Sequence, residues 1–245
     1  MMHNYRLIIE YFGKNFSGWQ IQPNVTTVQG TIESAIEKII GGKINLIGSG
    51  RTDAGVHALG QVANFKIEKK LEFFKFKHSL NSMLPKDIAI KDISEVQENF
   101  HSRFDAKKRS YLYLFSKNKS PFYYNYTFNY SPVFDIPIEK LNVISKLLLG
   151  EKDFTSFSKK KTDTKNMICN ILFAHWYKKG ELLFFRIDAN RFLHGMVRTI
   201  VGTVLEIAEK DLSENELIKI IEVQNRDEAG KSLPPQGLYL LKVEY

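Results

Sequence analysis

The stretch Gly48-Ser49-Gly50-Arg51-Thr52-Asp53-Ala54-Gly55-Val56-His57 lies between two segments that have the pattern of β-strands, residues 43–48 and 61–67. Gly50 and Gly55 permit backbone conformations that other residues avoid, and they let a ligand approach the backbone closely. The stretch is therefore predicted to be a tight turn that joins one strand to the next.

The segments outside this turn extend the pattern. Alternating apolar residues predict strands over 5–11 and 88–96, and apolar residues three and four positions apart predict helices over 28–40 and 71–83. Gly41 and Pro85 mark the ends of the two helices. The first half therefore has the predicted order β-α-β-β-α-β, which is a split β-α-β motif.

The second half shows a similar pattern, without any visible internal sequence repeat. Strands are predicted over 110–115, 169–178, 181–189 and 238–244, and helices over 138–149, 192–209 and from a capping box at 213–216 through 223. We expect an α+β fold of two pseudo-symmetric, ferredoxin-like α/β halves, residues 1–105 and 106–245. Their antiparallel sheets are expected to join, with a basic cleft between the halves that is completed by the second half.

The chain of 245 residues is basic, with 35 Lys and Arg against 27 Asp and Glu and a formal net charge of +8. Such a charge favours a polyanionic partner. Basic residues gather at 69–77, 107–109 and 159–165, beside aromatic residues that suit base stacking. Any one of these clusters is also what a solvated surface looks like. The three together favour RNA, although composition does not distinguish RNA from DNA.

Several classes of protein are disfavoured by the composition. The single cysteine, Cys169, rules out an internal disulfide framework and a multi-cysteine zinc site, and we expect it to be buried on a strand. The six histidines lack partners at ligand spacing, so no metal is expected. The longest apolar run, 200–208, is too short for a membrane span, and the amino terminus lacks a secretory signal pattern. These features favour a cytoplasmic protein.

Asp53 is the candidate reactive residue of the turn. The neighbouring guanidinium of Arg51 favours the ionised form of a carboxylate. An ionised carboxylate on a tight, partly desolvated turn is a candidate nucleophile or general base. The structural alternative is that Asp53 caps the turn and pairs with Arg51 without doing chemistry.

Residues 50–57, Gly-Arg-Thr-Asp-Ala-Gly-Val-His, followed by Gly-Gln-Val-Ala-Asn-Phe at 60–65, resemble the catalytic signature of the tRNA pseudouridine synthase A (TruA) family. The resemblance extends from residues 18–23 to residues 234–240. It implies a homodimer of two-halved subunits with an RNA-binding cleft. It also implies that uridine is converted to pseudouridine at positions 38, 39 and 40 of the tRNA anticodon stem-loop, without a metal or other cofactor.

The resemblance also implies roles for particular residues. Asp53 is expected to be the nucleophile on a flipped-out uridine, Tyr111 to stack on that base and move a proton, and Arg198 to pair with Asp53. Arg51 is expected to contact the extruded nucleotide. The residues expected to contact RNA along one further segment are Phe100, His101, Ser102, Arg103 and Phe104.

Some choices stay open from the residues alone. Tyr113 shares a strand face with Tyr111, so the pattern does not choose between them, and either ring is also typical of a core. An arginine beside an apolar helix face, such as Arg198, often extends to solvent. Whether Asp53 attacks the sugar or the base is not indicated. The sequence differs from the residues usual in the family at Phe12, Leu112 and Leu233.

Two other classes of function compete with a pseudouridine synthase. An RNA-binding module or chaperone would use the basic surface without chemistry, but it gives no reason for an aspartate accompanied by Arg51 and Arg198. A carboxylate-based nucleoside hydrolase would use the same residues and release free uracil. The mass of the product RNA separates the enzymes, since isomerisation leaves it unchanged.

Overall fold

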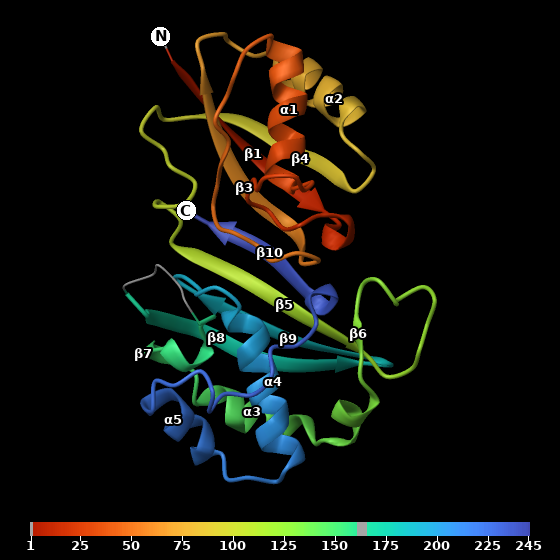
Figure 1. The fold of residues 1–245 in the computed structure, drawn as a ribbon, viewed down its shortest axis with the longest axis vertical. Helices are drawn as coiled ribbons and strands as arrows, with labels where there is room; N and C mark the ends of the chain where they lie inside the picture. Colours follow the sequence, from red (N-terminus) through yellow and green to blue (C-terminus); the bar gives the residue numbers. More distant parts are fainter. Residues whose placement is uncertain (1, 161–165) are drawn as a thin grey trace. The chain divides into compact units, whose positions relative to one another are not determined.

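The computed structural model describes residues 2–160 and 166–245 (Figure 1). The chain forms two compact units. The first contains Met1–Lys107 and Leu240–Tyr245, and the second contains Lys108–Tyr239. Lys161 and Lys165 of the third predicted basic cluster lie outside the described residues.

The first unit is a split β-α-β motif. Its elements are β1 (His3–Tyr11), α1 (Val28–Ile40), β2 (Ile47–Gly48), β3 (His57–Ile67), α2 (Phe73–Met83) and β4 (Ile88–Val96). The strands lie in the order β4-β1-β3-β2, and every neighbouring pair is antiparallel. The predicted order β-α-β-β-α-β of this half is confirmed.

Local sequence explains these elements. In β1, Tyr5, Leu7 and Ile9 are fully buried and alternate with half-exposed neighbours, because successive side chains of a strand point to opposite faces. Helix α1 begins where the Thr27 hydroxyl accepts a hydrogen bond from the Gly30 amide. It ends at Gly41, which has a φ of 75° that favours glycine. Its apolar stripe is buried, as the spacing predicts.

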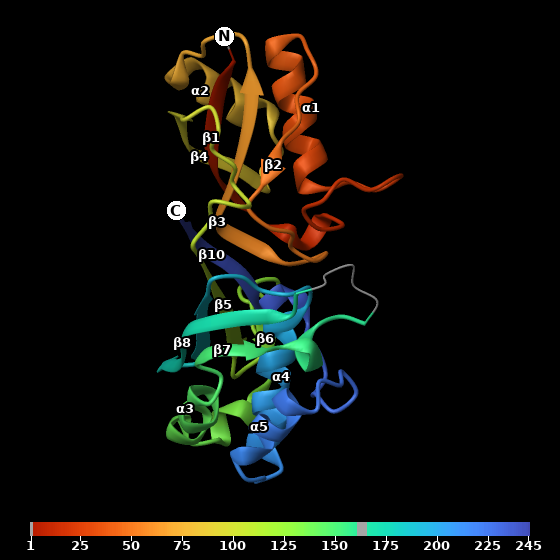
Figure 2. The same cartoon turned by 90° about the vertical axis from the view of Figure 1, so that its left-hand side faces the viewer.

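The second unit is also mixed α/β. Its elements are β5 (Lys108–Ser116), β6 (Phe128–Asn129), α3 (Ile138–Lys146), β7 (Gly150–Asp153), β8 (Ile168–Lys179), β9 (Leu182–Ala189), α4 (Met196–Glu209) and α5 (Asn215–Glu222). The strands β5-β9-β8-β7 are neighbours in that order, and all of these pairs are antiparallel. The three helices lie together beside this sheet (Figure 2). The last strand, β10 (Leu238–Glu244), begins in the second unit and ends in the first.

Strand β3 begins at His57 and not at residue 61, and three further predicted boundaries are wrong for identifiable reasons. Residues 43–46 do not form a strand, because the Ile44 and Leu46 amides donate to the Glu37 and Glu33 carboxylates of α1 instead of to a ladder. Helix α4 begins at Met196 and not at residue 192, since Gly195 has a φ of 74°. Helix α3 ends at Lys146 rather than at 149, where three-residue turns replace the α-helical pattern.

The predicted capping box at 213–216 is also wrong in detail. The Glu216 amide donates to the backbone oxygen of Ser213, and the N-cap residue of α5 is Glu214, whose side chain makes no capping bond. Cys169, as predicted, is fully buried on a strand, and burial raises the pKa of its thiol to about 11. Among the described residues, no helix has the length and apolarity to cross a membrane. The pseudo-symmetry of the halves and a basic cleft stay predictions.

Candidate functional site

The turn that carries Asp53 joins β2 to β3 in the first unit. Arg51 is exposed at its start, Thr52 is buried, and Asp53 is half-buried. The amide of Val56 donates to the Asp53 carbonyl at 3.2 Å, and Gly55 between them has a φ of 79°. This is the tight turn that the glycines predict, and it leaves the Asp53 side chain at the boundary between protein and solvent.

One side of this turn is held by residues from early in the chain. The Trp19 amide donates to the Thr52 carbonyl at 3.1 Å, and the hydroxyls of Tyr11 and Thr52 share a buried hydrogen bond of 2.7 Å. Gly18, with a φ of 91°, passes so close that a Cβ there would lie 2.6 Å from the Thr52 carbonyl oxygen. The residue before Asp53 is therefore fixed through both its backbone and its side chain.

The start of the turn is held from β3. The Gln61 side chain, fully buried, accepts from the Ser49 hydroxyl at 2.6 Å and donates to the Gly50 carbonyl at 3.1 Å. The indole of Trp19 lies against Gly48, where a Cβ would approach the ring to about 2.5 Å. Because these supports are buried, the turn has little freedom to move the carboxylate.

The end of the turn packs on the loop after β1. His57 is buried, its Nδ1 accepts from the Gly13 amide at 2.9 Å, and its ring stacks on Phe12 with centroids 4.7 Å apart. These contacts of His57 are structural, because they join the end of the turn to the loop after β1. This stacking ring comes from Phe12, one of the residues that differ from those usual in the family.

Tyr111 and Tyr113 on β5 have different contacts. Tyr113 is fully buried, and its hydroxyl donates to the Pro234 carbonyl at 2.7 Å. Burial raises the pKa of Tyr113 far above its ordinary value, and the positive charge of Arg198 opposes that rise. Tyr111 is 8% exposed and packs edge-on against Phe192, with centroids 5.1 Å apart. Both rings are therefore buried, and the assignment of Tyr111 as the catalytic tyrosine stays a prediction.

Arg198 lies in the first turn of α4 and is half-buried. Its Nε donates to the Leu233 carbonyl, and the Leu233 amide donates back to the Arg198 carbonyl at 3.2 Å. Both hydrogen bonds involve only backbone atoms of Leu233. The unusual side chain at this position therefore does not affect them. The arginine does not simply extend to solvent. Its pairing with Asp53 stays a prediction.

The segment Phe100–Phe104 belongs to the first unit, and its five residues differ in exposure. Ser102 is fully buried, where its hydroxyl donates to the Ile47 carbonyl at 2.8 Å and its amide to the Asn64 side chain at 2.9 Å. The Asn4 side chain donates to the Phe100 carbonyl at 2.9 Å. These contacts anchor the segment, so the buried Ser102 side chain is not placed to touch RNA.

The other end of the segment faces solvent. Phe104 is 75% exposed, its ring packs on His101 with centroids 4.3 Å apart, and the Arg103 guanidinium lies 5.6 Å from the same ring. Such an exposed stack of ring and guanidinium suits a nucleotide.

Sequence reasoning missed the residues that hold the candidate site. Tyr11, Trp19 and Gln61 act on the Asp53 turn from positions 8 to 42 residues away in the sequence. Trp19 and Gln61 lie inside the two segments quoted for the resemblance, which was the only signal for them. Hydrophobic periodicity does not indicate which distant residues contact the turn.

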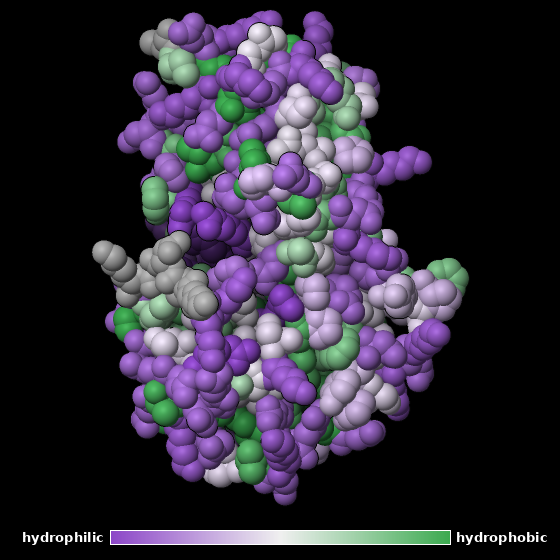
Figure 3. Space-filling view, viewed as in Figure 1, coloured by the Kyte–Doolittle hydropathy of each residue, from purple (hydrophilic) through white to green (hydrophobic). Residues whose placement is uncertain are grey.

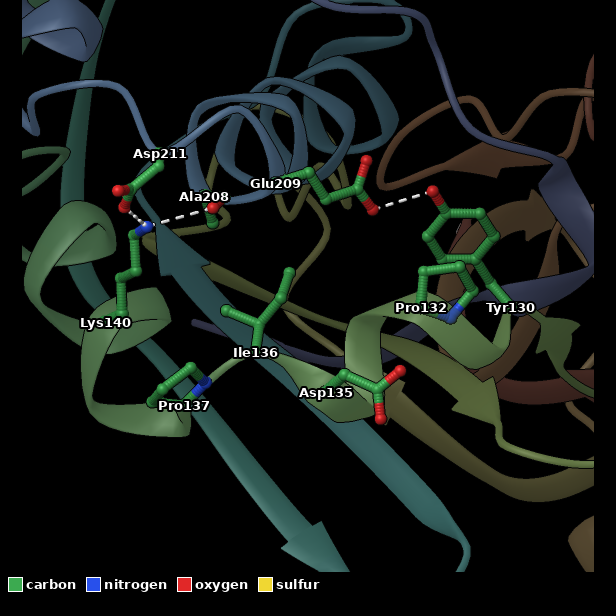
Figure 4. Close-up of a pocket in the computed structure, with 9 residues that line it drawn as sticks. All are labelled: Tyr130, Pro132, Asp135, Ile136, Pro137, Lys140, Ala208, Glu209 and Asp211. Carbon is green, nitrogen blue, oxygen red and sulfur yellow. Dashed lines mark hydrogen bonds and ion pairs between the residues drawn. The ribbon is translucent and has the colours of Figure 1, made fainter.

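A separate shallow pocket of about 520 Å³ lies in the second unit, at the carboxyl end of α4 (Figure 4). The Tyr130 hydroxyl donates to Glu209 at 2.7 Å, and this hydrogen bond raises the pKa of Tyr130 to about 12. Lys140 pairs with Asp211 across the other side. Ala208, in its lining, is ten residues after Arg198, which is about 15 Å along a helix. None of the candidate site residues lines this pocket.

Within the described residues, no group of three or more His, Cys, Asp or Glu side chains is arranged to hold a metal ion. Of the candidate residues, Asp53 and Arg51 lie in the first unit, and Tyr111 and Arg198 lie in the second.

Comparisons with known proteins find close relatives. The model of a tRNA pseudouridine synthase family matches residues 7–105 and 144–245, which include Asp53 and Arg198 but not Tyr111. A protein of Caldicellulosiruptor saccharolyticus named tRNA pseudouridine synthase A is 43% identical over the whole of both chains. One of Parabacteroides distasonis with the same name is 42% identical over 100% of this chain and 96% of the relative.

Among solved structures, a Cbf5-Nop10-Gar1 complex chain aligns with 82% of this chain and 53% of its own length. Its identity of 12% and TM-score of 0.37 are too low to bear on fold or function.

Proposed function

This chain belongs to the tRNA pseudouridine synthase A family, and we propose on that premise that it acts on positions 38, 39 and 40 of the anticodon stem-loop. As a member of the family it is an isomerase that converts uridine in tRNA to pseudouridine. Asp53 is the proposed nucleophile. The observation that carries this assignment is the turn itself, which holds one half-buried carboxylate through buried contacts on three sides.

The reaction needs few parts. The bond between N1 of uracil and C1′ of the ribose breaks, the base turns, and C5 bonds to C1′. The proton on C5 leaves and N1 gains one, so atoms balance without an imported group. A carboxylate oxygen stabilises the electron-poor sugar or bonds to the substrate covalently, as carboxylates do in glycoside hydrolysis. Holding that oxygen in place removes the entropic cost of finding it in the transition state.

The remaining residues take the roles that their surroundings suit. Tyr111, on the rigid strand β5, stacks on the flipped base and moves the C5 proton. Arg198, half-buried and hydrogen-bonded to Leu233 at the start of α4, pairs with Asp53 and orients its carboxylate. Arg51 is exposed beside the turn, where it contacts the backbone of the extruded nucleotide.

The exposed end of the segment Phe100–Phe104 supplies the RNA contacts of the first unit. Arg103 takes a phosphate, and Phe104 with His101 offers rings for stacking, while the buried Ser102 anchors the segment. The proposal extends to a homodimer that works in the cytoplasm. Sedimentation of the purified protein at several concentrations tests the dimer.

The test of Asp53 compares the variant Asp53→Asn with Asp92→Asn, an exposed aspartate on β4. Both are assayed on an unmodified tRNA transcript by chemical labelling of pseudouridine, without added cofactor. Asp53→Asn loses turnover by about 10³-fold or more, because the amide is a poor nucleophile, while Kd for tRNA changes by less than about 3-fold. Asp92→Asn keeps both. A wild-type single-turnover rate in Asp53→Asn would show that another residue is the nucleophile.

Mass spectrometry of the product RNA separates the alternatives. Isomerisation leaves the RNA mass unchanged and labels positions 38 to 40. A nucleoside hydrolase would instead release uracil and leave a lighter RNA. A binding module would retain tRNA with no change at any position.

A further inference from the structure

The loop between β5 and β6, residues 117–127, carries four exposed aromatic rings. We call it the aromatic loop. Its exposed side chains are Phe122 at 83%, Tyr124 at 66%, Tyr126 at 48% and Tyr123 at 44%. The loop stands out from the body of the second unit (Figures 1 and 3). It lies in the interval 106–143 that the family model does not match.

The backbone of the aromatic loop is nevertheless ordered by hydrogen bonds. The amides of Tyr123 and Tyr124 donate to the Ser120 carbonyl at 3.2 and 2.9 Å. The buried Thr127 hydroxyl bonds to the Ser116 hydroxyl and to the Tyr123 carbonyl. The Tyr239 hydroxyl, from β10, donates to the Tyr126 carbonyl at 2.7 Å. The rings are therefore presented on a fixed frame.

Exposed lysines lie in the aromatic loop and in a turn joined to it. Lys117 and Lys119 are exposed at the start of the loop. The Lys117 amide donates to the Glu181 carbonyl, which brings the β8–β9 turn with its exposed Lys178 and Lys179 to the same side of the unit. Glu181, the acidic residue of that turn, is engaged by the Asn118 side chain at 2.6 Å. The loop thus carries exposed rings and two exposed lysines, and the turn joined to its start carries two more lysines, one of which lies over the Phe134 ring.

Rings held out in water by an ordered backbone are typical of a surface that a partner covers. The lysines select the kind of partner. A positively charged frame with several rings in sequence suits a polyanion whose flat bases stack on the rings.

We propose that the aromatic loop is a second RNA-binding surface of the enzyme, on which unpaired bases of the tRNA stack on Phe122 and Tyr124. The proposal rests on the proposed function, because the tRNA is the substrate of that reaction. The surface contributes to binding and not to the chemical step, since it contains none of the candidate catalytic residues.

The test uses Phe122→Ala, Tyr124→Ala and the double variant in the full chain. Kd for an unmodified tRNA transcript is expected to rise by about 5-fold or more for each ring removed, because stacking is lost. The single-turnover rate at saturating tRNA is expected to stay at the wild-type value. Phe122→Trp and Tyr124→Phe keep a ring and keep the wild-type Kd. Thermal melting checks that each variant is folded, as the exposure of these side chains predicts.

A second measurement separates the contribution of the rings to RNA binding from the contribution of the lysine charges. The slope of log K against log salt concentration falls by about 0.7 for each of Lys117→Gln and Lys119→Gln, whereas the ring variants leave the slope unchanged. Replacing Phe122 by the photo-reactive p-benzoylphenylalanine and mapping the crosslinked nucleotide locates the contact directly. A crosslink to tRNA supports the proposal.

Three results would overturn it. Kd values of the alanine variants within 2-fold of wild type would show that the rings do not bind RNA. A crosslink only to a second copy of the chain, with a changed sedimentation coefficient in the variants, would assign the surface to a protein interface. A lower single-turnover rate with an unchanged Kd would assign it to catalysis. If wild type fails to convert uridine at all, the proposed function fails, which is a different outcome from any of these.

Discussion

The Asp53 turn of the first unit and the aromatic loop of the second are both ordered by hydrogen bonds, yet they differ in what they expose. The turn buries its supports, Tyr11, Trp19 and Gln61, and leaves one half-exposed carboxylate at the surface. The aromatic loop buries only its hydrogen-bonded end and exposes its rings. Chemistry at one atom needs positional accuracy from many buried contacts, whereas binding a flexible polymer needs area and charge. Changes in the turn should therefore alter the rate, and changes in the loop should alter affinity.

After the loss of the Asp53 carboxylate itself, the largest effect is expected from crowding the turn. In Gly13→Ala the new Cβ would lie 1.9 Å from the Val56 carbonyl oxygen, so the backbone beside Asp53 must shift. We expect turnover to fall by about 100-fold or more, with a loss of about 1–3 kcal/mol in the free energy of unfolding. The matched control is Gly42→Ala, whose Cβ meets no atom within 4 Å. Equal turnover in the two variants, measured per folded molecule, would contradict a tightly held turn.

A second effect separates the two tyrosines of β5. Tyr111→Phe removes the proposed proton carrier, so kcat should fall by about 100-fold or more. Tyr113→Phe instead leaves the part-buried Pro234 carbonyl without this donor, at a cost of about 1–3 kcal/mol, and keeps kcat. Urea unfolding and single-turnover kinetics on both variants check this. The reverse pattern would exchange their roles.

A smaller effect tests the hydroxyl pair beside Asp53. Thr52→Val removes the partner of the buried Tyr11 hydroxyl while keeping the side-chain shape. We expect a loss of about 1–3 kcal/mol in stability and about 10-fold in kcat, with KM for tRNA unchanged. Thr52→Ser keeps the hydroxyl and should restore kcat. A serine variant as slow as the valine variant would show that the hydrogen bond does not position Asp53.

The smallest effect is expected from removing a hydrogen bond that orders the backbone of the aromatic loop. Tyr239→Phe removes the hydrogen bond to the Tyr126 carbonyl but leaves Phe122 and Tyr124 in place. Kd for tRNA should rise by no more than about 3-fold, and kcat should stay constant, because only the order of the loop is reduced. Equilibrium binding at fixed salt measures it. A drop in kcat would contradict the division of labour between the turn and the loop.

Much of the fold was predictable because its signals are local. The bounds of α1, β4 and β10 agree with the residue patterns, since apolar periodicity and glycine or proline punctuation act over a few residues. The errors lie where another element competes for the backbone. Glu33 and Glu37 of α1 take the amides of residues 44 and 46, and no pattern within 43–48 reveals that competition.

The candidate site likewise has features that the local sequence predicts and features that depend on distant residues. The sequence by itself determined that a glycine-framed turn would present Asp53, because the need for a positive φ at Gly55 is a local property. Only the tertiary structure decided that Tyr11, Trp19 and Gln61 hold this turn, and that Tyr113 is bound to the Pro234 carbonyl. Those contacts join residues far apart in the chain, and close packing, which has no sequence period, selects them.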